Sequence, residues 1–297
     1  MSDQAPPAKT DPISRLTARV LALPAVRWLK PIMDDYGAAG GGLLASGVAF
    51  NSLFAILPSI LLIVSLLGLL LNDPLRLHEI VSDLASRFPP LEAFFEEALA
   101  DVSSGAVAFS ILGLIGLVWG SSRFYQSLDD AIARIFLGSP RRDPFQRGVR
   151  GVLSVAVLIG AVLAVVSVSG IVDQVADDLP LVGQASSFVG SAIGSALTTV
   201  LIFAVAVAVL YRIVPQPAPS WRAIRSPAIL VGTALGALTG LFALIAPRLV
   251  GGSLSVYGAF VAVFAAMIWL SYVAQAILVG AAWVHRRTLA STSPTDA

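Results

Sequence analysis

The chain has 297 residues, of which 57% are hydrophobic and 12% are charged, and its mean hydropathy is +0.85. A soluble domain carries about 25% charged residues, so this composition excludes a water-soluble enzyme and a nucleic-acid-binding domain. There is no cysteine, which excludes disulfides, thiolate metal sites and a cysteine nucleophile. The net charge of +1 creates no overall field that would attract nucleic acid.

The uncharged stretches of the chain predict its fold. Six intervals without Asp, Glu, Lys, Arg or His cover more than half of the chain: 36–72, 102–122, 151–172, 179–211, 226–247 and 249–284. A helix that crosses a ~30 Å hydrocarbon core needs about 20 apolar residues, so each interval can hold one span. The sequence therefore predicts an all-α polytopic membrane protein with six transmembrane helices, near 43–71, 105–123, 149–172, 188–211, 227–247 and 256–284.

The segments around these spans are polar or amphipathic. Residues 1–12 and 288–297 are polar, and we expect them to be disordered, with a single six-helix membrane domain over 13–287. Residues 13–33 combine apolar residues at near-helical spacing with four basic residues. They predict an N-terminal amphipathic helix, which either lies on the membrane surface near anionic lipid or packs as an ordinary cytoplasmic helix.

The largest loop, 72–104, carries its own helical pattern. Apolar residues follow one helical face before Pro89 and Pro90 and another face after them, and seven acids in 73–101 cover the opposite faces. We expect two short amphipathic helices outside the cytoplasm.

The distribution of basic residues predicts the orientation. The N-terminal segment, 123–150, 212–225 and the tail after 284 hold sixteen Lys and Arg, whereas the intervening segments hold three. Because basic residues are retained on the cytoplasmic side, both termini are predicted to be cytoplasmic.

Few polar residues lie inside the predicted spans. Asn51 and Pro58 are seven residues apart, so they share a face, and Pro58 frees a backbone carbonyl near mid-membrane. In the last span Trp269, Tyr272 and Gln275 follow at three-residue steps. We predict that these five residues line a polar crevice between the first and last spans. The alternative for Asn51 and Gln275 is a structural hydrogen bond between helices.

Small residues recur at four-residue spacing in four of the spans, including Gly116 and Gly120 in the second and Gly232, Gly236 and Gly240 in the fifth. Helix backbones approach closely at such positions. We favour static packing over sliding helices, and the same faces would permit a homo-oligomer.

No catalytic pattern is present. His78 and His285 are predicted on opposite sides of the membrane, and Asp129 and Asp130 point to different faces of one helix, so neither pair forms a metal or acid–base site. We expect no enzyme activity, no metal and no cofactor. The apolar pattern over 119–136 predicts that the second span continues as a helix on the cytoplasmic side.

Several short motifs carry a resemblance to a known family. They are 49–54 with 57–58, Trp119 with 128–131, 211–215 followed by Trp221, and Tyr257 leading to Trp269 and Gly280. In this order they resemble the YihY/virulence factor BrkB family, over nearly all of 30–285. The polar positions of these motifs are Trp119, Asp129, Asp130, Tyr211, Arg212, Pro215, Trp221 and Tyr257. The chain departs at Asp129, where many members have Asn, and at Ala282, where a Glu is common.

The resemblance implies a six-span protein of the bacterial inner membrane. Members are sometimes linked to serum resistance or to transport of envelope lipids, and some carry the label ribonuclease BN, which the lack of catalytic residues contradicts. We therefore expect a transporter or exporter of an envelope lipid or small molecule, with membrane lipids as partners. The alternative is a non-transporting envelope scaffold associated with virulence.

The orientation can be tested with reporter fusions after Gly138 and after Ala290. Because the basic residues cluster in these segments, cytoplasmic reporters should be active and export reporters silent at both positions. The reverse result at both positions would overturn the topology.

Overall fold

The computed structural model describes residues 24–71, 73–87, 91–103, 108–137, 143, 145–153, 192–250 and 256–292. All regular secondary structure in these residues is helical, which confirms the predicted all-α class. The helices are α2 (Pro24–Ala38), α3 (Gly41–Leu70), α4 (Pro74–Arg87), α5 (Glu92–Ser103), α6 (Ala108–Ile135), α9 (Ala192–Ile213), α10 (Trp221–Val250) and α11 (Val256–Thr292). A further helical segment covers 145–153.

Three helices in the described residues are long and apolar enough to cross a membrane. They are Gly41–Leu70 in α3, Trp221–Phe242 in α10 and Val263–Ser291 in α11, and Thr199–Ile213 in α9 is apolar but shorter. Each coincides with a predicted span. Helix α6 runs unbroken to Ile135, so the second predicted span does continue as one helix. Most of the third predicted span, 149–172, lies outside the described residues.

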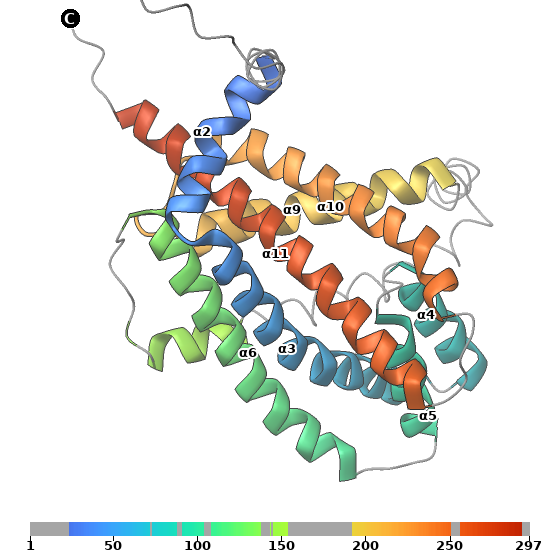
Figure 1. Cartoon of the computed structure of the whole chain (residues 1–297). Helices are drawn as coiled ribbons and strands as arrows, with labels where there is room; N and C mark the ends of the chain where they lie inside the picture. Colours follow the sequence, from blue (N-terminus) through green and yellow to red (C-terminus); the bar gives the residue numbers. More distant parts are fainter. Residues whose placement is uncertain are drawn as a thin grey trace, which may run out of the picture.

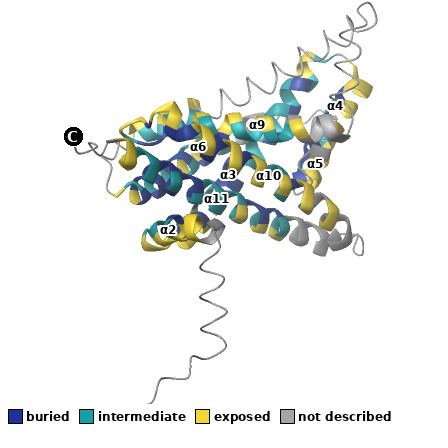
Figure 2. Cartoon of the chain, turned by 90° about the horizontal axis from the view of Figure 1, so that it is seen from above, coloured by how far each residue is buried: buried dark blue, intermediate teal, exposed yellow. Residues whose placement is uncertain are grey.

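Helix α11 is the centre of the bundle. It contacts α2, α3, α6, α9 and α10, while α6 packs mainly on α3 and α9 packs mainly on α10 (Figure 1). The principal helices therefore follow each other in the order α6, α3, α11, α10, α9. Most of their inward side chains form one large apolar core, and a small second cluster surrounds Leu117 of α6. The outward surfaces expose large aliphatic side chains of the kind that contact lipid (Figure 2).

The two short helices predicted in the largest loop are present. Leu77 and Val81 of α4 and Phe95 of α5 are buried, and α5 packs on both α4 and α3. The two helices lie at the end of the bundle away from α2 (Figure 1).

Helix α2 combines the two alternatives that its sequence left open. Ile32 and Tyr36 are buried where α2 packs on α11 and α3, but Leu29 and Met33 remain exposed. One apolar face is thus packed and the other is free to meet lipid. The predicted segment 13–23 lies outside the described residues.

At the other terminus, α11 continues to Thr292, past the predicted domain boundary at residue 287. The Thr288 hydroxyl donates to the Val284 carbonyl at 2.9 Å, a hydrogen bond within the helix.

The four basic segments come together at one end of the bundle. Arg286 of α11 makes two hydrogen bonds to Asp35 of α2, one of 3.1 Å from Nη2. Arg287 donates to the Arg222 carbonyl at 3.2 Å, and the rings of Phe136 and His285 are 4.8 Å apart. We call this the basic end. Because contacts join all four segments, they must lie on one side of any membrane that the bundle crosses.

Pro58 determines how α3 meets α6. Proline has no amide hydrogen, so the carbonyl of Phe54, four residues earlier, loses its helical donor. The backbone of Gly120 in α6 lies against this carbonyl so closely that a Cβ atom there would overlap the oxygen. One turn earlier, a Cβ on Gly116 would lie 3.2 Å from Cγ of Pro58. The freed carbonyl is therefore covered by α6.

Glycines also bring α9 and α10 together. A Cβ on Gly232 would lie 2.6 Å from Cα of Ala204, and one on Gly236 would lie 2.7 Å from Val200. A Cβ on Gly240, in contrast, would meet no atom within 4 Å. Among the glycines of the predicted small-residue faces that the structure describes, Gly116, Gly120, Gly232 and Gly236 are occupied by contacts within the chain.

Substituting Gly120 tests the close approach of α3 and α6. Gly120→Ala should lower the free energy of unfolding by about 1–3 kcal/mol, the usual cost of overpacking, measured by thermal unfolding in detergent. Gly47→Ala in α3 is the matched control, because a Cβ there meets no atom within 4 Å. It should leave stability unchanged or raise it by up to about 1 kcal/mol through helix propensity. Equal effects of the two substitutions would contradict the packing.

Candidate functional site

The predicted crevice joins α3 and α11, and these helices do pack side by side. The Asn51 amide donates to the carbonyl of Gly47 at 2.9 Å, and the Gln275 amide donates to Oγ of Ser271 at 3.3 Å. Each polar side chain is thus bonded within its own helix. Pro58 lies against Gly116 of α6, so it belongs to the α3–α6 contact.

Trp269 and Tyr272 differ in burial although they are only three residues apart. Tyr272 is 53% exposed and Trp269 only 4%. A three-residue step in a helix rotates the side chain by about 300°, so successive steps drift away from the starting face. Trp269 alone of these two points into the bundle.

Within the part of the span region that the structure describes, two buried polar groups have no hydrogen-bond partner. They are the indole Nε1 of Trp269 in α11 and the hydroxyl of Thr239 in α10, which is 5% exposed. Thr233 and Thr288, in contrast, each donate to the carbonyl four residues earlier, at 2.9 Å. An unpaired buried polar group costs about 1–3 kcal/mol, so each requires an explanation.

Trp269 and Thr239 lie about one helical turn apart in depth. Val231 and Gly280 mark a contact of α10 with α11, since a Cβ on Gly280 would be 2.5 Å from the valine. The two helices are antiparallel (Figure 1). Along α10, Thr239 is eight residues from this contact, or ~12 Å at 1.5 Å per residue. Along α11, Trp269 is eleven residues from it in the same direction, or ~17 Å. The two polar groups are therefore about one helical turn apart along the bundle.

We call these two residues the Trp269–Thr239 site. An indole N–H only donates, whereas a hydroxyl donates and accepts, so each of the two groups could bond to an oxygen atom. Sequence reasoning selected Trp269 for its position in α11 and did not select Thr239. The sequence feature that could have indicated Thr239 is its hydroxyl, which lies on the same helix face as the apolar Leu235 and Val231.

Among the family-motif positions, Tyr211 connects α9 to α11. It is fully buried, and its hydroxyl donates to the carbonyl of Ile277 at 2.6 Å. Gly280 leaves the space for this hydroxyl, because a Cβ there would overlap it. Pro215 is buried in the turn that follows.

The next two motif positions form one contact at the basic end. The Arg212 guanidinium donates to the Pro219 carbonyl at 2.7 Å and lies over the Trp221 ring, 5.9 Å from its centre.

The remaining motif positions are spread along the bundle. Trp119 packs edge-on against Phe54, with ring centres 5.5 Å apart. Asp129 is buried, whereas Asp130 is partly exposed and pairs with Arg147 at 3.0 Å, so the two acids have different surroundings. Tyr257 lies in α11, but its side chain is outside the described part of the chain.

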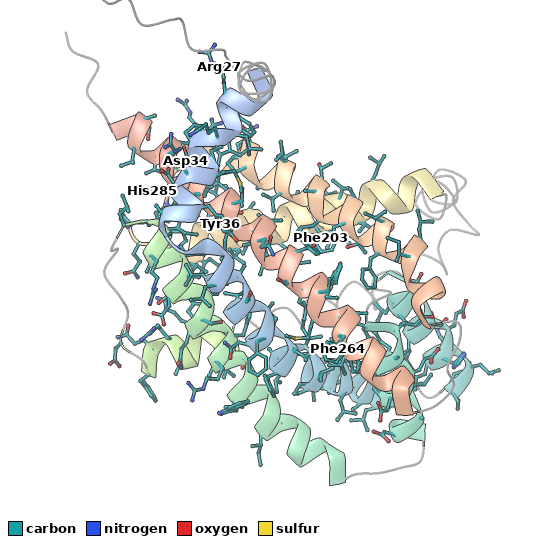
Figure 3. All side chains as sticks on the ribbon, in the orientation of Figure 1. Arg27, Asp34, Tyr36, Phe203, Phe264 and His285 are labelled. Carbon is teal, nitrogen blue, oxygen red and sulfur yellow. The ribbon has the colours of Figure 1, made fainter. Side chains whose placement is uncertain are left out.

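The basic end contains further buried polar groups that the sequence did not single out. Tyr36 of α2 and His285 of α11 lie where these two helices meet (Figure 3). The Tyr36 hydroxyl and His285 Nε2 are buried without a hydrogen-bond partner. Burial raises the pKa of Tyr36, so its phenol stays protonated at neutral pH.

The comparison with protein families decides which family the chain represents. The model of the family Virulence factor BrkB matches residues 32–296. The chain belongs to this family. Neither the comparison with curated proteins nor that with solved structures gave a match. Family membership and the apolar helices together make this BrkB-family chain a membrane protein.

The bond between Tyr211 and Ile277 can be tested by removing one hydroxyl. Tyr211→Phe should lower the free energy of unfolding by about 0.5–1.5 kcal/mol, the usual worth of such a bond. Tyr272→Phe, which removes an exposed hydroxyl, should change nothing in the same thermal-unfolding measurement. A Tyr211→Phe protein as stable as wild type would show that the bond does not support the bundle.

Proposed function

We propose that this BrkB-family protein is a six-span protein of the bacterial inner membrane that transports or exports an envelope lipid or a small molecule. The Trp269–Thr239 site supports the proposal most directly. In hydrocarbon no water can pair a polar group, so two unpaired groups about one helical turn apart in depth are costly unless a ligand oxygen meets them.

The orientation in this proposal has both termini in the cytoplasm. The basic end gathers four segments that are rich in Lys and Arg, and such segments remain on the cytoplasmic side. Helices α4 and α5 then face the periplasm. The proposal involves binding and movement of a molecule and no catalytic step.

The second candidate function is a non-transporting envelope scaffold. The exposed acids of α5, including Glu92, Glu96 and Glu97, favour it because they form a charged surface at the outer end. The two functions differ in whether the purified protein moves a substrate by itself.

Reconstituted liposomes, assayed for lipid scrambling and for ion-coupled uptake, test the proposal. Thr239→Val replaces an unpaired hydroxyl with a methyl group of similar size, so stability should rise by about 1 kcal/mol or more. Transport should fall about tenfold, the equivalent of one lost hydrogen bond to the substrate. Trp269→Phe should also lower transport, and because the smaller ring leaves a cavity it should lower stability as well.

Thr233→Val is the matched control, because Thr233 lies on the same helix, is exposed and bonds to its own backbone. It should leave transport unchanged. Parallel loss of stability and transport in the Thr239→Val protein would identify the hydroxyl as a structural group. Wild-type protein that moves no lipid or solute would favour the scaffold.

A further inference from the structure

Four arginines and two tryptophans meet where α10 begins and α11 ends. We call Arg212, Arg222, Arg225, Arg287, Trp221 and Trp283 the arginine–tryptophan patch. Besides the contact of Arg212 with Pro219 and Trp221, the Arg287 guanidinium donates to the Arg222 carbonyl at 3.2 Å. It also lies over the Trp283 ring at 5.9 Å, and Trp283 packs edge-on against Trp28 of α2 at 4.6 Å. The contacts therefore run without a break from α9 to α2.

Among the described residues, no acid forms an ion pair with an arginine of this patch. In the described residues, the ion pairs of the basic end join Lys30 to Asp34, Arg286 to Asp35 and Arg147 to Asp130. None of them includes an arginine of the patch.

The fixed arginines keep most of their hydrogen-bonding capacity. A guanidinium has five N–H donors, and Arg212 and Arg287 each give one to a backbone carbonyl. Stacking on tryptophan fixes the guanidinium planes. Arg222 and Arg225 are exposed and lie one turn apart. The patch thus presents ordered, unneutralised donors, an arrangement that binds phosphate oxygens well.

The position of the patch indicates where that phosphate comes from. Trp221 is 54% exposed and is the first residue of an apolar segment long enough to cross a membrane. Tryptophan is enriched at this depth, the membrane–water interface. Trp221, Arg225 and Ile229 follow at four-residue steps and so share one helix face, and Ile229 is exposed. Along this face the side chains change from charged to apolar, in the same order as the headgroup and acyl chains of a phospholipid.

We propose that the arginine–tryptophan patch is a binding site for the headgroup of an anionic phospholipid, with the acyl chains lying along α10. Each basic residue beside an anionic membrane surface strengthens binding about fivefold. The site does not depend on the Trp269–Thr239 site or on transport. A protein that transports nothing would still bind the lipid here.

Thermal unfolding of the full chain in neutral detergent, with added lipid, tests the proposal. Phosphatidylglycerol should raise the unfolding temperature in a concentration-dependent way, and phosphatidylcholine should not. A triple variant, Arg222→Gln, Arg225→Gln and Arg287→Gln, should weaken the response to phosphatidylglycerol by about 100-fold in lipid concentration, the product of three fivefold effects. Each protein is compared with its own lipid-free sample, so a change in basal stability does not affect the result.

The matched control removes three exposed arginines outside the patch, Arg76→Gln, Arg134→Gln and Arg150→Gln. It should respond to phosphatidylglycerol as wild type does. An equal loss in the control would show that overall charge, rather than the patch, attracts the lipid. Stabilisation by inorganic phosphate alone would identify a small-anion site and overturn the lipid assignment. If the triple variant does not fold, the single variant Arg225→Gln should show about a fivefold weaker response, and an unchanged response would contradict the proposal.

Discussion

The carbonyl of Phe54 is the point on which the helix arrangement depends. A backbone carbonyl inside a membrane cannot be left to water, and Pro58 removes its helical donor. Gly120 brings the backbone of α6 against it. Because α6 occupies this face of α3, α11 packs on another face, and the remaining sides of α11 receive α10 and α2. One proline and one glycine thus fix the closest contact between α3 and α6.

Helix α11 carries polar groups that have partners and polar groups that lack them, and the latter include His285 Nε2 at the basic end. At the basic end, Arg286 and Arg287 are bonded to groups on α2 and α10. Deeper in the bundle, Trp269 is buried with no partner. Stability alone would favour an apolar residue at such a position. Residues that break this rule while their neighbours obey it are expected at functional sites, which is why Trp269 and Thr239 carry the functional proposal.

Periodicity was sufficient to predict the helices but not the long-range contacts. The apolar faces of α4 and α5 and the continuation of α6 to Ile135 follow from a repeat of 3.6 residues, which is a local property. The pairing of Asp35 with Arg286 joins residues 251 positions apart, and no local pattern encodes it. The unpaired Thr239 could not be predicted for a different reason: a helical threonine ordinarily bonds its own backbone, as Thr233 does.

The central position of α11 has a consequence for how the chain is assembled during synthesis. This helix contacts α2, α3, α6, α9 and α10, yet it is translated after all of them. The earlier helices must therefore wait in the bilayer with their α11-facing surfaces uncovered, including the Tyr211 hydroxyl that later bonds to Ile277. The bundle closes only once α11 is inserted. Membrane integration of the early spans and final folding are thus separate events. Most of the interior packs only after α11 has been translated.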